Sequence, residues 1–276
     1  MTHNITPAAF SLAHLGLSDH GPVPLIEAAA ASGFRAVGLP LRSGALKPLR
    51  HEIVGNPSMI RDIKAALSAT GVEIFDVESL VLGHEPDAEG LRRIFDVAAS
   101  LGASRMSCLG TEQAGESARP SDGQNTARLN AIAGVAAEFG LRMSVEFMMF
   151  RTVRTLADAI ALVARADAPN LGIIVDALHL HRSGGTSADL DAIPAGRLSH
   201  VQFCDAVAEP PRDLTQEARS GRLLPGEGVL ALRDLLAAVP PDTPLALEIP
   251  VAALATLPVA DRVARGAQSL RALGSH

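Results

Sequence analysis

The chain has 276 residues, a formal net charge of −6 at pH 7, and a composition that is 47% hydrophobic and 20% charged. This length and apolar content can supply a large core, and a barrel of eight strand–helix units needs about 250 residues. The chain is acidic, has no long basic run and contains no Trp or Tyr. It therefore lacks the basic surface and most of the stacking rings typical of nucleic-acid-binding proteins, and we expect no nucleic-acid partner.

Targeting and redox features indicate a cytoplasmic protein. The first residues show no basic region followed by an apolar stretch, so we expect no signal peptide. The longest apolar runs are too short for a membrane span, and we expect no membrane partner. Cys108 and Cys204 are far apart in apolar contexts, which is typical of reduced core thiols rather than of a disulfide.

Short apolar runs alternate with longer Ala- and Leu-rich segments along the whole chain. The runs predict strands at 10–17, 34–39, 72–77, 104–108, 142–147, 171–175, 198–203 and 245–249. The segments between them predict helices at 24–32, 58–70, 87–101, 121–139, 155–165, 187–193, 229–238 and 259–273. Four of these helices are followed by a glycine, the residue that most readily adopts the left-handed conformation of a helix end. The long break at 206–228 is rich in Pro, Arg and Gly and predicts a functional or disordered loop.

Strict alternation of eight strands with eight helices predicts a parallel sheet, and eight is the number that closes into a (β/α)8 TIM barrel. We expect one such domain over residues 1–276. The alternative is an open doubly wound sheet, but no G-x-G-x-x-G follows the first strand.

The segment IIVDALHLHRSGG, residues 173–185, concentrates chemistry directly after a predicted strand. Asp176, His179 and Arg182 follow a run of β-branched residues. Charged and imidazole groups at the end of a buried strand are costly unless a partner compensates them. A metal ion or an anionic substrate is one such partner; a structural cluster that caps the next helix is the other interpretation.

Three more strands carry a polar side chain at the same end. Glu146, Gln202 and Glu248 each lie between apolar neighbours, so alternation along a strand points all three inward. With Asp176 they would converge at the carboxyl end of the barrel, where TIM-barrel active sites lie. Crowded carboxylates raise one another's pKa unless a cation compensates them. Oxygen ligands favour Mn²⁺ or Mg²⁺, although pairing of each acid with an arginine would also satisfy the charges.

The motifs VEF, IIVDALHLHRSGG, HVQFCDA, LLPGEG and LALEIP resemble the late-strand motifs of the xylose isomerase-like TIM-barrel superfamily. This is the sugar phosphate isomerase/epimerase and AP endonuclease 2-like group, which also contains inosose dehydratase, 3-dehydroshikimate dehydratase and hydroxypyruvate isomerase. The resemblance implies metal ligands at Glu146, Asp176, Gln202 and Glu248. At the third position the chain has Gln where ketose epimerases usually have His, and the fourth strand lacks the histidines that endonuclease IV needs.

Four further residues are substrate-binding candidates. The resemblance implies a substrate or near-metal role for His179, with a structural role as the alternative. Arg182 could clamp a carboxylate or phosphate, or it could be an exposed loop residue. Glu78 could bind a substrate hydroxyl or pair with an arginine, and His14 could face the pocket.

We therefore predict a metal-dependent isomerase or epimerase that acts on a small polyhydroxy carbonyl substrate through an enediolate. Glu146 and Glu248 would be the catalytic base and acid, and the cofactor would be one divalent ion, Mn²⁺ or Mg²⁺, with Co²⁺ or Zn²⁺ as alternatives. The same ligands would serve a dehydratase of the inosose or 3-dehydroshikimate type. The other alternative is a barrel that binds a sugar without catalysis. By family resemblance, a homodimer or homotetramer is the expected assembly.

Overall fold

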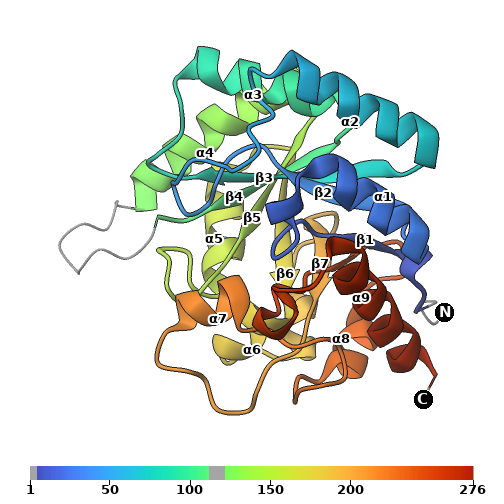
Figure 1. Cartoon of the computed structure of the whole chain (residues 1–276). Helices are drawn as coiled ribbons and strands as arrows, with labels where there is room; N and C mark the ends of the chain where they lie inside the picture. Colours follow the sequence, from blue (N-terminus) through green and yellow to red (C-terminus); the bar gives the residue numbers. More distant parts are fainter. Residues whose placement is uncertain (1–4, 112–121, 276) are drawn as a thin grey trace.

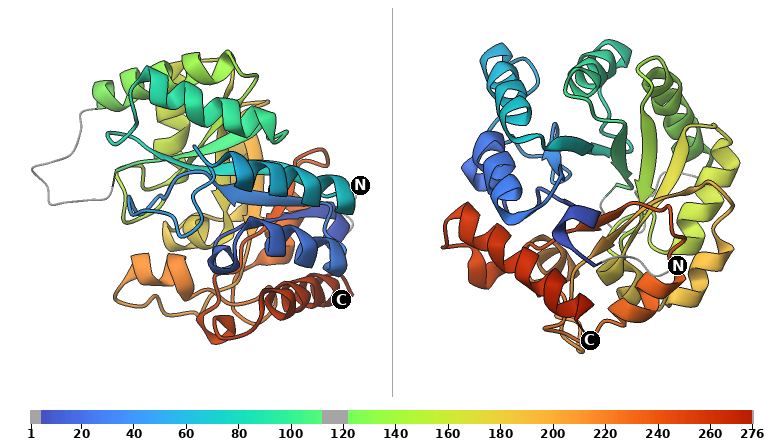
Figure 2. Two further views of the ribbon diagram at one scale, coloured as in Figure 1. Left: turned by 45° about the horizontal axis from the view of Figure 1, so that its top comes forward. Right: turned by 90° about the vertical axis from the view of Figure 1, so that its right-hand side faces the viewer.

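The computed structural model describes residues 5–111 and 122–275, and within them eight parallel strands close into a barrel. Each strand pairs with the next in the chain, and the first pairs with the last through Phe10 and Leu245. The view along the barrel in Figure 2 shows the helices arranged around the strands, and Figure 1 shows both chain ends on the same side of the molecule. The TIM-barrel prediction is confirmed, because an open sheet would leave the first and last strands unpaired.

The eight strands lie at the predicted runs, and their bounds differ most at the ends of the first and third strands. They are β1 (Phe10–Leu12), β2 (Ala36–Pro40), β3 (Glu73–Val81), β4 (Arg105–Leu109), β5 (Arg142–Glu146), β6 (Leu171–Asp176), β7 (Leu198–Phe203) and β8 (Leu245–Leu247). The first strand is shorter than predicted, since the chain turns away after Leu12 and reaches a left-handed glycine, Gly16.

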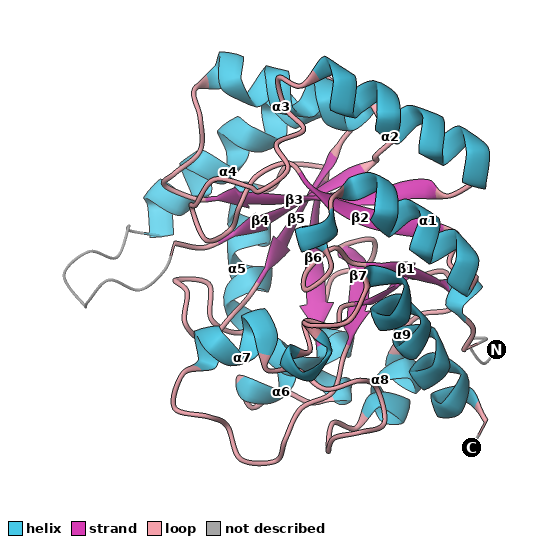
Figure 3. Cartoon of the chain, in the orientation of Figure 1, coloured by secondary structure: helices cyan, strands magenta, loops and turns pink. Residues whose placement is uncertain are grey.

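Helices follow the strands and cover the outside of the barrel (Figure 3). They are α1 (Pro22–Ser32), α2 (Pro57–Thr70), α3 (Ala88–Ser100), α4 (Asp122–Ala137), α5 (Leu156–Ala166), α6 (Ala177–Arg182), α7 (Leu214–Ser220), α8 (Leu232–Ala238) and α9 (Val259–Gly274). The segment predicted as a helix at 187–193 forms a 3-10 helix, Ser187–Ala192. Ser121, the first residue of the predicted fourth helix, lies outside the described residues.

Two short helices were not predicted. The α6 helix begins directly after β6, because the Asp176 carboxylate accepts a hydrogen bond from the His179 backbone N–H and caps it. The α7 helix lies inside the segment predicted as a loop, and Asp213 caps it in the same way at Gln216. Both have fewer than eight residues, so neither shows a long apolar periodicity.

The barrel interior is more polar than is usual for this architecture, whose lumen is generally filled by branched apolar side chains. Ser144 on β5 and Ser199 on β7 share a hydrogen bond of 2.7 Å across the lumen. His200 on β7 lies 3.9 Å from Asp76 on β3. The apolar core therefore lies mainly between the strands and the helices, as in the burial of Val145 and Phe147 on either side of Glu146.

Within the described residues, no helix combines the length and apolar character needed to cross a membrane.

A substitution at Gly16 tests how tightly the turn after β1 packs against the segment that follows β8 and carries Glu248. Its φ is +80°, and a Cβ there would lie 2.5 Å from the Pro250 Cα. We expect Gly16→Ala to lower the free energy of unfolding by about 2–5 kcal/mol, from the left-handed backbone and the clash together. Gly140→Ala is the matched control, because the φ of Gly140 is +69° and no described residue lies within 4 Å of a Cβ added there. Urea unfolding would measure both, and equal losses would contradict the packing argument.

Candidate metal centre and active site

Four polar residues at the carboxyl ends of neighbouring strands form the centre of the site. Glu146 and Asp176 are the last residues of β5 and β6, Gln202 lies near the end of β7, and Glu248 directly follows β8. The strand register brings them level, since Asp176 pairs with Gln202 in the β6–β7 ladder. The Glu248 N–H donates to the Phe203 carbonyl at 2.9 Å, which extends the β7–β8 ladder to this residue.

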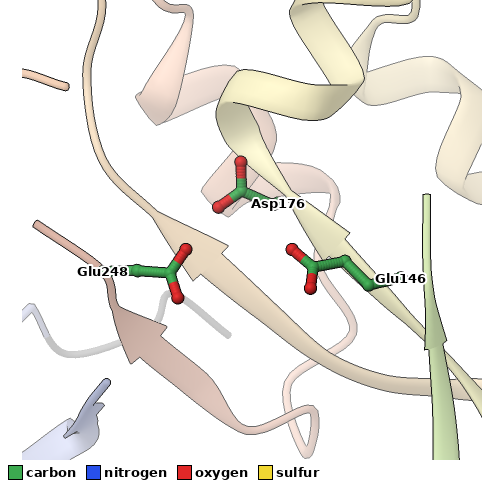
Figure 4. Close-up of side chains that lie close together, drawn as sticks. All are labelled: Glu146, Asp176 and Glu248. Atoms are coloured by element: carbon green, nitrogen blue, oxygen red, sulfur yellow. The ribbon is translucent and has the colours of Figure 1, made fainter. Parts of the chain in front are cut away.

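The three carboxylates point toward one another, as Figure 4 shows. One oxygen from each of Glu146, Asp176 and Glu248 lies within 4.8 Å of the others, and all three residues are buried. Gln202 is buried beside them, with its Nε2 3.5 Å from the Glu248 Oε1. The structure therefore brings together the four residues named from the sequence as ligand candidates.

Arg222 is the cation among these acids. Its Nη1 donates to the Asp176 Oδ2 at 2.5 Å, and its Nη2 lies 2.7 Å from the Glu248 Oε2. The side chain is 1% exposed, and its Nε donates to the Ala218 carbonyl at the end of α7. Isolated β-bridges at Gly221 and Leu223 hold the backbone on both sides of it. One buried guanidinium thus links the ends of β6 and β8.

The charges at the centre are only partly compensated. Burial raises the pKa of Glu146 well above its ordinary value, and Glu248 and Asp176 add to the effect. Burial also raises the pKa of Glu248 to about 7, although Arg222 opposes the shift. For Asp176, Arg222 and the His179 N–H outweigh burial and lower the pKa. The Glu146 and Glu248 carboxyls therefore bind a proton more readily than an exposed carboxyl does. A cation bound beside them would displace that proton.

The donor set fits one divalent cation. Carboxylate and amide oxygens are hard ligands, and ligand atoms within 4.8 Å of one another can share one ion. Within residues 5–111 and 122–275, the buried Gln202 Oε1 has no hydrogen-bond partner, so an acceptor is available there. Arg222 contacts the Oδ2 of Asp176 and the Oε2 of Glu248, and each of these carboxylates has a second oxygen. The Gln202 oxygen and the Asp176 and Glu248 carboxylates can therefore coordinate the same ion.

A cavity of about 240 Å³ opens from this centre, and His14, Glu78 and His179 line it with Glu146 and Glu248. The His14 Nδ1 lies 3.6 Å from the Glu78 Oε2. The His179 Nε2 lies 3.9 Å from the Glu146 Oε1 and has no hydrogen-bond partner among the residues that the structure describes. Burial lowers the pKa of each histidine to about 4, so both imidazoles are neutral near pH 7.

The structure does not bring Arg182 to this cavity. Its guanidinium pairs with Glu217 on α7, with distances of 3.0 Å and 2.6 Å, and it also donates to the Val207 carbonyl. Both side chains of the pair are nearly buried. Arg182 therefore holds α7 against the segment after β7, and the same helix receives the hydrogen bond from Arg222.

Sequence reasoning missed four arginines that line the cavity: Arg42, Arg151, Arg219 and Arg222. Arg222 directly precedes the LLPGEG motif, which was the one available signal for it. Arg222 and Asp176 are 46 positions apart in the sequence, so no local sequence pattern predicts their contact. Asp205 was also missed, and it organises the same motif by accepting hydrogen bonds from the Gly226 and Leu230 N–H groups.

Metal binding should depend on pH, because a cation must displace protons from the carboxyls whose pKa is raised. Glu248, with a pKa of about 7, is increasingly protonated below that pH. We expect Mn²⁺ affinity to fall from pH 8 to pH 6, by roughly tenfold per unit for each proton displaced. Calorimetry in buffers of different ionisation enthalpy would count the protons released. Glu248→Gln should release fewer, and an affinity that is constant with pH would contradict this electrostatic description.

Comparison with known proteins identifies related chains. A 3-dehydroshikimate dehydratase from Pseudomonas aeruginosa is 30% identical over an alignment of 258 residues that covers 87% of this chain and 37% of that protein. An inosose isomerase from Halalkalibacterium halodurans is 26% identical over 110 residues, or 39% of this chain and 38% of that protein. The matched region thus covers well under half the length of each of these relatives.

The solved structures show the same fold. The crystal structure of an IOLI protein, described as having a bound zinc atom, superposes with a TM-score of 0.77 at 16% identity and covers 97% of this chain and 98% of that one. The family model for the xylose isomerase-like TIM barrel matches residues 26–273. The chain therefore belongs to the xylose isomerase-like TIM-barrel family.

Proposed function

We propose that this protein is a metal-dependent enzyme that removes a proton next to the carbonyl group of a small polyhydroxy substrate. The observation that carries the proposal is that oxygens of Glu146, Asp176 and Glu248 lie within 4.8 Å of one another, while Glu146 and Glu248 line a cavity. Such a cluster of buried acids is costly to maintain in a barrel that only holds a sugar. Its raised pKa values are typical of groups that transfer protons.

In this proposal Glu146, Asp176, Gln202 and Glu248 hold one divalent ion, with Mn²⁺ or Mg²⁺ favoured by the all-oxygen donor set. Zn²⁺ is the alternative supported by the related IOLI structure. When bound, the ion polarises the substrate carbonyl and stabilises the negative charge that develops on it.

The protein's own acids would move the protons. Glu146 and Glu248 come from β5 and β8, the two outer strands of the four that build the site, so they can approach a substrate from different sides. A carboxylate placed in this way can accept the proton next to the carbonyl, and its protonated form can return it. Arg222 would position Asp176 and Glu248, and His14 and Glu78 would bind substrate hydroxyls from the β1 and β3 side.

For the outcome of the reaction, the relatives favour dehydration. A relative whose match covers 87% of this chain is a dehydratase. One carboxylate would take the proton from the carbon next to the carbonyl, and the other carboxyl would protonate the hydroxyl leaving the adjacent carbon. The products are an unsaturated carbonyl compound and water.

Isomerisation or epimerisation is the second candidate, supported by the inosose isomerase among the relatives. It shares the first proton transfer and differs only in where the proton returns. The sequence-based prediction named this outcome first, and the same acids would perform it.

Replacing either acid should separate proton transfer from metal binding. Glu146→Gln and Glu248→Gln each keep an oxygen ligand but lose the base, so we expect about 10²- to 10⁴-fold slower turnover with metal still bound. Deuterium incorporation next to the carbonyl in D₂O, measured on 3-dehydroshikimate and on an inosose, reports the shared step. Loss of water from either compound is measured from the ultraviolet absorbance of the unsaturated carbonyl product.

The control is Glu138→Gln, because Glu138 lies on the outer surface in a pair with Arg92. Wild-type deuterium exchange in both active-site variants would assign the proton transfer to another residue. Exchange without loss of water would favour isomerisation over dehydration.

A further inference from the structure

Glu78 on β3 is a buried acid of the cavity that is not among the candidate metal ligands. It lines the cavity together with Glu146 and Glu248. Its side chain is 13% exposed, and its Oε2 lies 3.6 Å from the His14 Nδ1. Its Oε1 is buried without a hydrogen-bond partner among the residues that the structure describes. The cluster of acids within 4.8 Å of one another does not include Glu78, so this carboxyl would stand beside the ion without binding it.

The surroundings of Glu78 favour its protonated form. Burial raises the pKa of Glu78 well above its ordinary value, and the charges of Glu248, Asp76 and Glu146 add to the shift. Arg222 opposes this shift without cancelling it. The same interactions mean that the Glu78 carboxyl lies within electrostatic reach of the candidate metal ligands. A carboxyl that holds a proton near neutral pH can give it to a molecule bound in the cavity.

The contacts of Glu248 make it a poorer proton donor than Glu78. The Glu248 Oε2 lies 2.7 Å from the Arg222 Nη2, and its Oε1 lies 3.5 Å from the Gln202 Nε2. In the proposed function Glu248 also holds the ion. A guanidinium and a metal cation both favour the ionised carboxylate, which has no proton to donate. Because Glu78 is paired with neither, it is the better placed of the two acids to act as a proton donor.

His14 faces the Glu78 carboxyl from the turn after β1. Its carbonyl accepts a hydrogen bond from the Leu17 N–H at 2.9 Å, which fixes this turn. The His14 side chain is 9% exposed, and its Nδ1 has no hydrogen-bond partner within the described part of the chain. Burial lowers the pKa of His14 to about 4, so the imidazole is neutral near pH 7. A neutral imidazole of low basicity can orient the Glu78 carboxyl without taking its proton.

We propose that Glu78 donates the proton that converts the leaving hydroxyl into water, with His14 as its positioning residue. This rests on the proposed function and assigns the second proton transfer of its dehydration to Glu78, in place of a candidate metal ligand. The Glu146 carboxylate takes the proton from the carbon next to the carbonyl, and the electron pair of that C–H bond forms the carbon–carbon double bond. The C–O bond of the adjacent carbon breaks, and its oxygen takes the Glu78 proton. Proton exchange with solvent then restores both acids.

A leaving group that needs no proton separates this role from a structural one. The probe is whichever of 3-dehydroshikimate and an inosose exchanges deuterium with the wild-type, Mn²⁺-loaded protein, together with its analogue that has fluorine in place of the leaving hydroxyl. Glu78→Gln should lose water from the probe about 10²- to 10⁴-fold more slowly than wild type, because the proton donor is gone. Deuterium exchange and loss of fluoride should stay within about threefold of the wild-type rates, because neither step uses this acid. His14→Gln should show a smaller loss of the same kind.

Glu73→Gln is the matched control, because Glu73 lies on the same strand and is exposed. Thermal unfolding and Mn²⁺ binding of each variant would show that the fold and the metal site are intact. If Glu78→Gln does not fold, Glu78→Asp, which withdraws the carboxyl by one methylene group, carries the same comparison.

Four results would overturn the proposal and leave the first proton transfer of the proposed function standing. They are wild-type water loss in Glu78→Gln, an equal loss of rate with the hydroxyl and fluorine compounds, and recovery by the fluorine compound of Glu248→Gln but not of Glu78→Gln. The fourth is deuterium exchange without loss of water in the wild-type protein. Absence of exchange by the wild-type protein with both 3-dehydroshikimate and an inosose would overturn this proposal and the proposed function together.

Discussion

The site depends on one buried guanidinium that joins two carboxylates. Arg222 contacts Asp176 and Glu248, and without it three acids would face one another in a buried space. Removing one partner from a buried ion pair commonly costs about 3–5 kcal/mol, because the other charge is left uncompensated. Arg222 does not neutralise the whole cluster, however. Burial and the neighbouring acids keep the pKa values of Glu146 and Glu248 raised, and a divalent ion that displaces these protons would compensate the carboxylates.

The strands, the β-bridges and α7 each position a different part of the site. Hydrogen-bond ladders set the four ligand candidates level at the strand ends, and the β-bridges beside Arg222 hold it over them. The pair of Arg182 and Glu217 fixes α7, whose last turn accepts the hydrogen bond from Arg222. Arg182, which the sequence suggested as a direct substrate contact, therefore does not line the cavity. It stabilises α7, the helix beside the site.

The sequence was informative where a pattern is local or repeated. Alternation of apolar runs and glycine-terminated helices predicted the eight-unit barrel, and strand parity predicted that Glu146, Gln202 and Glu248 share a side. It was less informative where a contact is distant in the chain. Arg222 and Asp205 act through loop geometry. Neither leaves a periodic signal, because each position follows from tertiary packing rather than from the neighbouring residues.

The central claim is that Glu146, Asp176, Gln202 and Glu248 together hold one divalent ion beside Arg222. Anomalous diffraction from crystals of the Mn²⁺-loaded protein tests it most directly. The account predicts one strong peak per chain, within bonding distance of oxygens from all four residues, about 2.0–2.6 Å for hard divalent cations. No peak at this position, or a peak that excludes Gln202 and two of the carboxylates, would contradict it.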